Sequence, residues 1–379
     1  MHKRTCATRL AGSRCALAAA ALFISCQATL GQVSYTTIPL LPGFDEVQVS
    51  GISGDGSTVV GQLFDHPVIP GGQTLRHALR WTRFGGTTDL GTLGDMNSSA
   101  DGTSFDGSII VGSSGPAGGP TRPVRWVSGV IEDLGLPTLP GFTVVAAGAT
   151  TTSHDGSVVA GAAFAPGTVP YRHSAADGYQ ALATAGVVHD MSADGSIIVG
   201  DGSPVAGGGF RWSTDDGLQS LGPLPPTWQL SYPNAISADG TTIVGRLQRG
   251  FPIFDSRAFT WNEDNGYQML EELTPGTQTF ANDVSADGSV VVGRAFGGAC
   301  VWIDGEGFLI TDLLALAGID LGGAMLTESR AVSDDGLTIA GMGFDAAGFG
   351  QAWVVTIPAP GTGALLLGVC VAVIRRRRV

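Results

Sequence analysis

The chain has 379 residues, enough for one large domain or two ordinary ones, and its 43% hydrophobic content is too high for a disordered chain. Its 58 glycines follow no Gly-X-Y period, which excludes collagen. All 33 acidic residues lie in residues 32–357, where 12 arginines and no lysine leave a net charge of −21. Such a surface repels nucleic acid and anionic lipid, so we expect no nucleic-acid partner.

Residues 1–31 have the pattern of a secretory signal peptide. They open with basic residues and no acidic residue, continue with the apolar run CALAAAALFIS, and end in small and polar residues. This order predicts export through the Sec pathway, with cleavage near Ala28 or Gly31. A lipoprotein modification at Cys26 is the alternative.

Residues 32–357 contain seven copies of a motif in which Ser-x-Asp-Gly precedes a short Val/Ile run that ends in glycine. The clearest copy is SADGSVVVG at 285–293. The motifs recur about every 47 residues, which predicts one supersecondary unit of about four strands per repeat. The seven motif aspartates are Asp55, Asp106, Asp155, Asp194, Asp239, Asp287 and Asp335.

Four strands are predicted in each repeat. The first precedes the Asp-Gly turn, and the second is the Val/Ile run; a tight hairpin between them needs the positive φ that glycine allows. The third strand ends in Trp, as in HALRWT (77–82), and the fourth contains Leu-Gly, as in TDLGTL (88–93). In the third repeat His173 occupies the Trp position.

The seventh repeat ends after its third strand, whereas SYTTIPLL (34–41) precedes the first repeat without a unit of its own. Pairing 34–41 with 351–357 would supply the missing strand. We therefore predict an all-β fold, a seven-bladed β-propeller closed by the N-terminal strand. A β-solenoid is the alternative.

The motif aspartates are predicted to be structural. Calcium needs six to eight oxygen ligands, and each turn offers a single carboxylate at one corner of its unit. Asp and Ser in such turns bond their own backbone instead. We therefore expect no metal at these positions.

A ring of varied polar residues is predicted three positions before each motif serine, at the start of the innermost strand and near one mouth of the central channel. Propellers commonly bind ligands there, so these residues are a candidate binding site. Exposed residues at the ends of loops are the alternative interpretation. The ring comprises Ser50, Asp101, Thr150, His189, Asn234, Asn282 and Arg330.

No other chemical motif stands out. There is no G-x-S-x-G, H-E-x-x-H, C-x-x-C or phosphate-binding Gly-Lys-Ser/Thr sequence, and Cys300 is the one cysteine of residues 32–357. No catalytic residue, metal site or cofactor is predicted. Asp101, His189 and Arg330 are the ring members whose chemistry would suit acid–base work.

Residues 358–379 read as a sorting or anchor segment. Pro358 and Pro360 precede an apolar stretch at 361–374, about 21 Å long as a helix against a bilayer core of about 30 Å. Four arginines follow it and would stay cytoplasmic. They are Arg375, Arg376, Arg377 and Arg378.

The C-terminal tail and the repeats each resemble a known bacterial family. The tail is similar to the PEP-CTERM sorting signal, with Ala359 where that family has Glu, which implies removal by a membrane protease of the exosortase type. A plain membrane anchor is the alternative. The repeats, carried most clearly by RHALRW (76–81) and SRAFTW (256–261), resemble HAF extracellular repeats, which imply an extracellular surface protein and no particular activity.

These observations divide the chain into three segments and lead to two alternative functions. The segments are the signal peptide (1–31), the repeat domain (32–357) and the sorting segment (358–379). The first function is a non-catalytic surface protein associated with exopolysaccharide, matrix or other surface proteins. The alternative is a propeller glycosidase or lyase acting at the channel mouth. Near-uniform repeats, with 64–75 as the one notable loop, favour binding.

Overall fold

The computed structural model describes residues 33–66, 74–94, 97–116, 119–203, 208–250 and 255–357. The predicted signal peptide and sorting segment, with Pro358, Pro360 and the four arginines, lie outside the described residues. Residues Tyr35–Thr356 form one compact unit. In the described part of the chain, no helix is long and apolar enough to cross a membrane.

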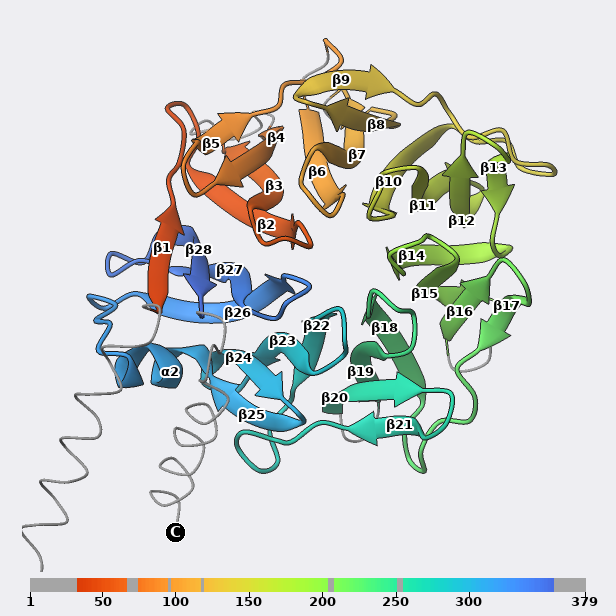
Figure 1. Ribbon diagram of the computed structural model, residues 1–379. Coiled ribbons are helices and arrows are strands. Elements are labelled where there is room, and N and C mark those ends of the chain that lie inside the picture. The colour runs from red at the N-terminus through yellow and green to blue at the C-terminus, as the bar shows by residue number, and fades with distance from the viewer. Residues whose placement is uncertain are drawn as a thin grey trace, which may run out of the picture. The chain divides into compact units, whose positions relative to one another are not determined.

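The compact unit is built from antiparallel sheets of consecutive strands that stand around a common centre (Figure 1). The first sheet contains β2 (Glu46–Ile52), β3 (Thr58–Asp65), β4 (Leu75–Thr82), β5 (Gly86–Asp89), β6 (Asn97–Thr103), β7 (Ile109–Gly115), β8 (Arg122–Val127) and β9 (Val130–Asp133). The second contains β10 (Ala146–Thr152), β11 (Val158–Ala165), β12 (Gly167–Ser174) and β13 (Gly178–Ala181). The third contains β14 (Ala185–Met191), β15 (Ile197–Ser203), β16 (Gly209–Ser213) and β17 (Gly217–Ser220).

The last three sheets follow around the same centre in Figure 1. The fourth contains β18 (Leu230–Ile236), β19 (Ile243–Arg249), β20 (Asp255–Asn262) and β21 (Gly266–Met269). The fifth contains β22 (Phe280–Val284), β23 (Val290–Ala295), β24 (Gly298–Ile303) and β25 (Glu306–Leu309), and the helix α2 (Ile310–Leu316) follows it. The sixth contains β26 (Met325–Val332), β27 (Thr338–Phe344), β28 (Gly350–Thr356) and β1 (Ser34–Ile38).

Four consecutive strands are the building unit, as the repeat length predicts. The first sheet has eight strands because β4 and β6 share one parallel pair, Arg76 with Asn97; otherwise its two halves are separate four-stranded meanders. The all-β class and the four-stranded unit are therefore confirmed. The innermost strands are β2, β6, β10, β14, β18, β22 and β26 (Figure 1).

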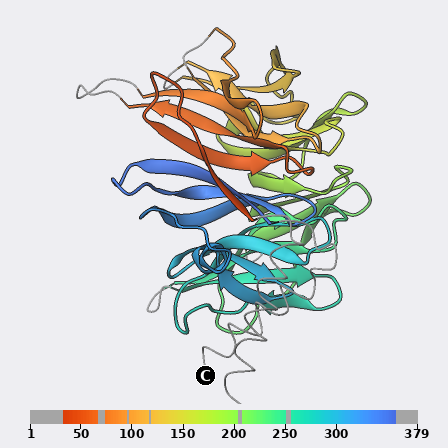
Figure 2. The same ribbon diagram turned by 60° about the vertical axis from the view of Figure 1, so that its left-hand side comes forward.

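The N-terminal strand β1 lies beside β28 at the outer edge of the sixth sheet. Tyr35 accepts a hydrogen bond at its hydroxyl from the Gln351 amide, 3.0 Å away. Ile38 is buried in a cluster that includes Val47 of β2 and Ala352 of β28. Figure 2 shows the β26–β28 strands between the β2–β5 strands and the β22–β25 strands. The first and last repeats therefore share a core.

Tryptophans of the third strands join neighbouring units. The Trp126 indole N–H donates to the Leu90 carbonyl at 2.8 Å, and Trp261 bonds Leu221 in the same way at 2.6 Å. The third repeat has no Trp, and there the Tyr179 hydroxyl donates to the Leu134 carbonyl at 2.9 Å. A buried indole or phenol whose polar atom is satisfied contributes both apolar area and a directed contact.

The predicted fourth strands are displaced. Leu-Gly segments such as 88–93 were expected to be strands, but the strand in the first repeat is β5 (Gly86–Asp89), and Leu90 and Gly91 follow it in a loop. The physical reason is that a tight turn after Trp81 returns the chain at once, so pairing with β4 is complete at Asp89. The leucine then packs inward from the loop, where Leu90 is buried.

Candidate functional site

Each innermost strand contains a β-bulge, and the bulged residue is the polar residue predicted for the ring. In the first repeat Val49 pairs with Gly61 and Gly51 with Val60, so Ser50 has no partner on β3. The same register shift occurs in every repeat. A bulge re-aims a side chain out of the regular alternation of a strand. The bulged residues are Ser50, Asp101, Thr150, His189, Asn234, Asn282 and Arg330.

The bulge explains the glycine that ends each Val/Ile run. A Cβ added to Gly61 would lie closer than 3.0 Å to the Gln48 carbonyl oxygen, because the bulged strand presses its backbone against β3 there. In every repeat, a Cβ added to the equivalent glycine would lie at a similar distance from the carbonyl oxygen of the residue two positions before the bulged residue. These glycines are Gly61, Gly112, Gly161, Gly200, Gly245, Gly293 and Gly341.

The position of the ring within the strand differs from the prediction. The residues were expected at the start of the innermost strand, but Ser50 is the fifth of seven residues in β2 (Glu46–Ile52) and Thr150 the fifth of seven in β10 (Ala146–Thr152). The strands begin earlier because the first strand pairs along almost the whole length of the second. In the first repeat this pairing extends to Glu46 and Phe64.

All seven bulged residues line one central cavity of about 180 Å³. This volume is below the 300–1,000 Å³ that is typical of sites for drug-sized ligands. At about 30 Å³ per molecule, the cavity has room for roughly six waters. The structure therefore brings the whole predicted ring together around a small space.

The motif turns narrow one end of this cavity. Their second residues, which include Gly54, His154, Ala238 and Asp334, line it. Backbone bonds run from turn to turn around the centre: Phe105 N–H donates to the His154 carbonyl at 2.9 Å, and His154 N–H donates to the Ala193 carbonyl at 2.8 Å. The Asp334 N–H donates to the Gly54 carbonyl at 2.9 Å, which links the last repeat to the first.

The motif aspartates bond within their own turns. The Ser285 hydroxyl donates to Asp287 Oδ1 at 2.9 Å, and the same oxygen accepts the Ser289 backbone N–H at 2.9 Å. The Ser285 hydroxyl in turn accepts the Val290 N–H. The same bonds recur at Asp55, Asp106, Asp155, Asp194, Asp239 and Asp335.

These bonds favour the ionised carboxylate. Hydrogen bonds from Ser289 lower the pKa of Asp287, and hydrogen bonds from Ser108 and Ser104 lower the pKa of Asp106. The turn aspartates are thus carboxylates held by neutral hydroxyl and backbone N–H donors at a structural corner. In the described part of the chain, no group of three or more His, Cys, Asp or Glu side chains is arranged to hold a metal ion.

Four carboxylates that line the cavity, those of Asp101, Asp190, Asp283 and Asp334, have a raised pKa instead. Burial raises the pKa of Asp101 to about 6, against the hydrogen bond that it accepts from Ser99. Burial also raises the pKa of Asp190 to about 6. Burial, and then repulsion by Asp190, raise the pKa of Asp283 to about 7. Raised carboxyl pKa values gather at functional sites more often than elsewhere.

Asp190 and Asp283 also hold neighbouring repeats together. Asp190 Oδ2 accepts the Ile236 N–H at 3.0 Å, and Asp283 Oδ2 accepts the Val332 N–H at 2.7 Å. Each bond crosses to the next innermost strand. These two carboxylates therefore have a structural role as well as a place in the cavity wall.

Several ring residues are fixed by partners. His189 Nε2 lies 2.9 Å from Asp201 Oδ1. The Asn282 amide donates to Glu328 Oε1 at 2.9 Å and to the Ser329 carbonyl at 2.8 Å. Arg330 Nε donates to Glu328 Oε2 at 2.9 Å. The residues that line the cavity therefore include His189, whose imidazole pairs with the Asp201 carboxylate, and Arg330, whose guanidinium pairs with the Glu328 carboxylate.

The sequence reasoning missed the partners of the ring. Asp190 and Asp283 directly follow bulged residues. Asp201 directly follows Gly200, the glycine that ends the Val/Ile run of its repeat and is called here the motif glycine. Gln62 follows the motif glycine of the first repeat, and its amide donates to Asp101 Oδ1 at 3.3 Å. The sequence does contain a signal for these partners. The position after the bulged residue and the position after the motif glycine are fixed relative to the motif, and their residues vary between repeats as the ring residues do.

One departure from uniform repeats was also missed. The sequence indicates 64–75 as the one notable loop. The structure also has an insertion between β25 and β26, which consists of the helix α2 and residues 317–324. Motif spacing hides the insertion. The turn between β23 (Val290–Ala295) and β24 (Gly298–Ile303) is short enough to offset it.

Comparison with known proteins addresses the fold. Neither a protein-family model nor a curated protein sequence matches the chain. TolB from Acinetobacter baumannii is similar with a TM-score of 0.45 and 11% identity, over 81% of this chain and 65% of TolB. A gluconolactonase from Xanthomonas campestris has a TM-score of 0.40 and 12% identity, over 88% of this chain and 93% of that one.

A further similarity is to the acylaminoacyl peptidase of Pyrococcus horikoshii, with a TM-score of 0.50 and 10% identity. It covers 84% of this chain and 53% of the peptidase, so the chain spans about half of that protein. At this identity the likeness extends to the fold alone. With the ring of four-stranded sheets around a centre, it identifies the chain as a β-propeller.

Proposed function

We propose that the chain is a seven-bladed propeller closed by its N-terminal strand. Three observations support closure: the position of β1 beside β28, the shared core of Val47 and Ala352, and the hydrogen bond from the Asp334 N–H to the Gly54 carbonyl. The division of the eight-stranded sheet into two meanders supports the blade count. A ring closed in this way leaves only short, protected sheet edges.

We also propose that this propeller is a binding protein whose site is the central cavity. The observation that carries this is the bulge in every innermost strand, which directs polar side chains of six different types into one cavity while the Ser-x-Asp-Gly turn stays constant. Packing needs only the constant positions. Varied groups on a constant scaffold are typical of recognition.

The size of the cavity favours a small group as the bound species. A volume of about 180 Å³ suits one terminal unit of a larger molecule, because full ligand pockets are larger. The ring offers both donors and acceptors from Arg330, Asn282 and Asp101. We therefore propose that the propeller holds the end of an extracellular polysaccharide, or a polar terminal group of a surface protein.

Location is part of the same proposal. The basic and apolar leader favours export, and the apolar tail with its four arginines favours transient anchoring and processing by an exosortase-type enzyme. The net charge of −21 on residues 32–357 suits a soluble extracellular domain. The resemblance to HAF repeats and to PEP-CTERM signals supports this location.

An enzyme acting on polysaccharide is the second candidate. The observation in its favour is the raised pKa of Asp101 and Asp283 at a cavity that also contains the His189–Asp201 pair. A carboxyl group that stays protonated near neutral pH is a suitable general acid. Acid–base chemistry at this cavity would require a reactive group of the substrate to enter it.

One experiment separates the two candidates. The full chain is screened against extracellular polysaccharides for binding and, by a reducing-end assay, for cleavage. The cavity variants Asp101→Asn, His189→Ala and Arg330→Gln are compared with Arg122→Gln, an exposed and ion-paired arginine far from the cavity residues in sequence. Binding without cleavage, lost in the cavity variants alone, supports the binding protein. Cleavage lost in those variants supports the enzyme. No response to any glycan contradicts the enzyme and the polysaccharide site, and leaves a terminal group of a surface protein as the proposed ligand.

A further inference from the structure

A second and larger hollow shares no lining residue with the central cavity. It has a volume of about 770 Å³, within the range typical of small-molecule sites. One wall comes from β22–β24 of the fifth sheet, with Phe280, Arg294 and Phe296. The other comes from α2 and the start of β26, with Thr311 and Met325. We call this hollow the β22–β26 groove.

The insertion and the short turn described above form this groove. Phe296 and Gly297 make the tight connection between β23 and β24, so no long loop covers the end of the fifth sheet. The inserted α2 and residues 317–324 build up the opposite wall. The groove therefore lies where this repeat departs from the common plan.

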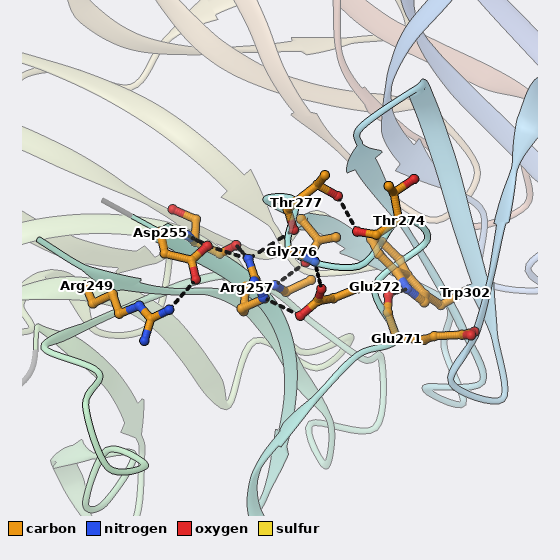
Figure 3. A network of polar contacts seen from close by, with 12 residues as sticks. Arg249, Asp255, Arg257, Glu271, Glu272, Thr274, Gly276, Thr277 and Trp302 are labelled. Atoms are coloured by element: carbon orange, nitrogen blue, oxygen red, sulfur yellow. Dashed lines mark hydrogen bonds and ion pairs between the residues drawn. The ribbon is translucent and has the colours of Figure 1, made fainter. Parts of the chain in front are cut away.

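A polar network fixes a third side of the groove (Figure 3). The Arg257 guanidinium is buried and donates to Asp255, to Glu272 Oε1 at 2.8 Å and to the Thr277 carbonyl at 3.0 Å. Glu272 in turn accepts the Gly276 N–H. Buried, charge-assisted bonds of this kind make the loop that carries Thr277 a preformed wall.

The lining combines exposed apolar groups with positive charge. The side chains of Phe296 and Met325 are 68% and 59% exposed, a large apolar surface for two neighbouring positions. The Arg294 guanidinium carbon lies 4.1 Å from the centre of the Phe280 ring. Arg246 approaches the same ring at 5.7 Å. Arg294 therefore stacks on an aromatic ring of the groove, whereas Arg246 does not line the groove and lies closer to the Tyr232 ring, at 4.6 Å.

Neither cation has an acidic partner. No carboxylate of the described residues lies within 4.0 Å of the Arg246 or Arg294 guanidinium groups, although acidic residues outnumber arginines by 33 to 12 in residues 32–357. Both arginines directly follow a motif glycine, and the other repeats carry no cation at this position. Those repeats carry Gln62, Ser113, Ala162, Asp201 and Met342.

We propose that the β22–β26 groove binds a carboxylate attached to a ring with an apolar face. The carboxylate accepts paired hydrogen bonds from Arg294, whose planar guanidinium matches it, and Arg246 adds positive charge nearby. The apolar face of the ring packs on Phe296 and Met325. This chemistry occurs in a uronic-acid unit of an acidic polysaccharide and in a free aromatic acid. The site is separate from the central cavity and does not rest on its function.

Calorimetric titration of the full chain with trigalacturonate, with the neutral trigalactose and with 2-naphthoate tests this proposal. We expect binding of one or both acids, weakening with added salt, and no binding of the neutral sugar. Binding of trigalacturonate alone identifies the polysaccharide source, and binding of naphthoate alone identifies the free acid. Equal binding of the neutral sugar, or no binding of either acid, overturns the proposal.

Variants locate the site. We expect Arg294→Gln to weaken binding of the acid about tenfold or more, since it replaces the charged guanidinium with a shorter, neutral polar group. Phe296→Ala, at an exposed position, is expected to weaken it several-fold. The control Arg122→Gln changes an exposed, ion-paired arginine that does not line the groove, and it is not expected to alter affinity. Unchanged binding in both groove variants contradicts the proposal.

Discussion

Two positions of the same repeat, three residues apart, have opposite behaviour. The motif serine is Ser in all seven copies, and its hydroxyl bonds the motif aspartate and a backbone N–H of its own turn. The bulged residue before it differs in almost every copy, from Ser50 to His189 to Arg330. One position makes the same contacts each time, and the other faces a shared cavity.

The difference shows which parts of a repeat are constrained by folding. The turn must reproduce a fixed set of short-range bonds, so only Ser, Asp and Gly serve. The bulge fixes where a side chain points but not which side chain it is. Constant backbone geometry with free choice of side chain is what a recognition surface requires.

The largest expected effect tests the link between the bulge and the motif glycine. Gly61→Ala should lower the free energy of unfolding by about 3 kcal/mol, because its Cβ would meet the Gln48 carbonyl oxygen closer than 3.0 Å and the backbone must shift. Denaturant unfolding measures the change.

Gly51→Ala is the matched control. Gly51 lies in the same hairpin, but an added Cβ meets its nearest atoms, the Asp101 oxygen and a Val60 methyl group, at 3.5 Å. The change in the free energy of unfolding should stay below about 1 kcal/mol. Equal losses in both variants would show that the close approach at Gly61 does not constrain the sequence.

The sequence predicts the parts of the fold that are written in local chemistry. The Ser-x-Asp-Gly turns follow from the bonding of short polar side chains, and the strand class follows from the Val/Ile runs. The ring was found because its register is fixed relative to the turn. Its place within the strand was wrong, since pairing length depends on the second strand and not on the motif.

Features made by contacts between repeats were not predictable in the same way. Asp190 bonds the backbone of Ile236, 46 positions away, and no local pattern marks that contact. The α2 insertion was masked by the short β23–β24 turn, since equal motif spacing was read as equal repeats. The replacement of a Trp contact by Tyr179 became clear only once its hydroxyl was seen at the Leu134 carbonyl.

The next largest effect on the free energy of unfolding is expected from pH, because the pKa values of the cavity carboxylates and of the turn aspartates are shifted in opposite directions. Asp190 and Asp283 have folded pKa values raised to about 6 and about 7, so the native state binds more protons than the unfolded state between pH 4 and 7. Stability should therefore rise as the pH falls through this window, by about 2 kcal/mol after allowance for water in the cavity. Thermal unfolding between pH 3 and 8 measures the profile.

Below pH 4 the turn aspartates reverse the trend. The folded pKa values of six of them are lowered, so the stability that these six contribute is present above the unfolded pKa and is lost as the pH falls through the folded one. The six are Asp55, Asp106, Asp155, Asp194, Asp239 and Asp287. Asp283→Asn should flatten the profile above pH 5 only, and Asp287→Asn should change it below pH 4 only. A monotonic profile in the unsubstituted chain would contradict the assignment.

The smallest effect is expected at the ring itself. The hydroxyl of Thr150 makes no hydrogen bond to any described residue, whereas Thr152, two positions on in β10, donates to the Val158 carbonyl at 2.8 Å. Thr150→Val should change the free energy of unfolding by less than about 0.5 kcal/mol. Thr152→Val should lower it by about 1 kcal/mol, because the Val158 carbonyl keeps the Ser153 N–H but loses its second donor. If Thr150→Val cost as much as Thr152→Val, the bulged positions would be part of the folding constraint, and the variety of their side chains would need another explanation than recognition.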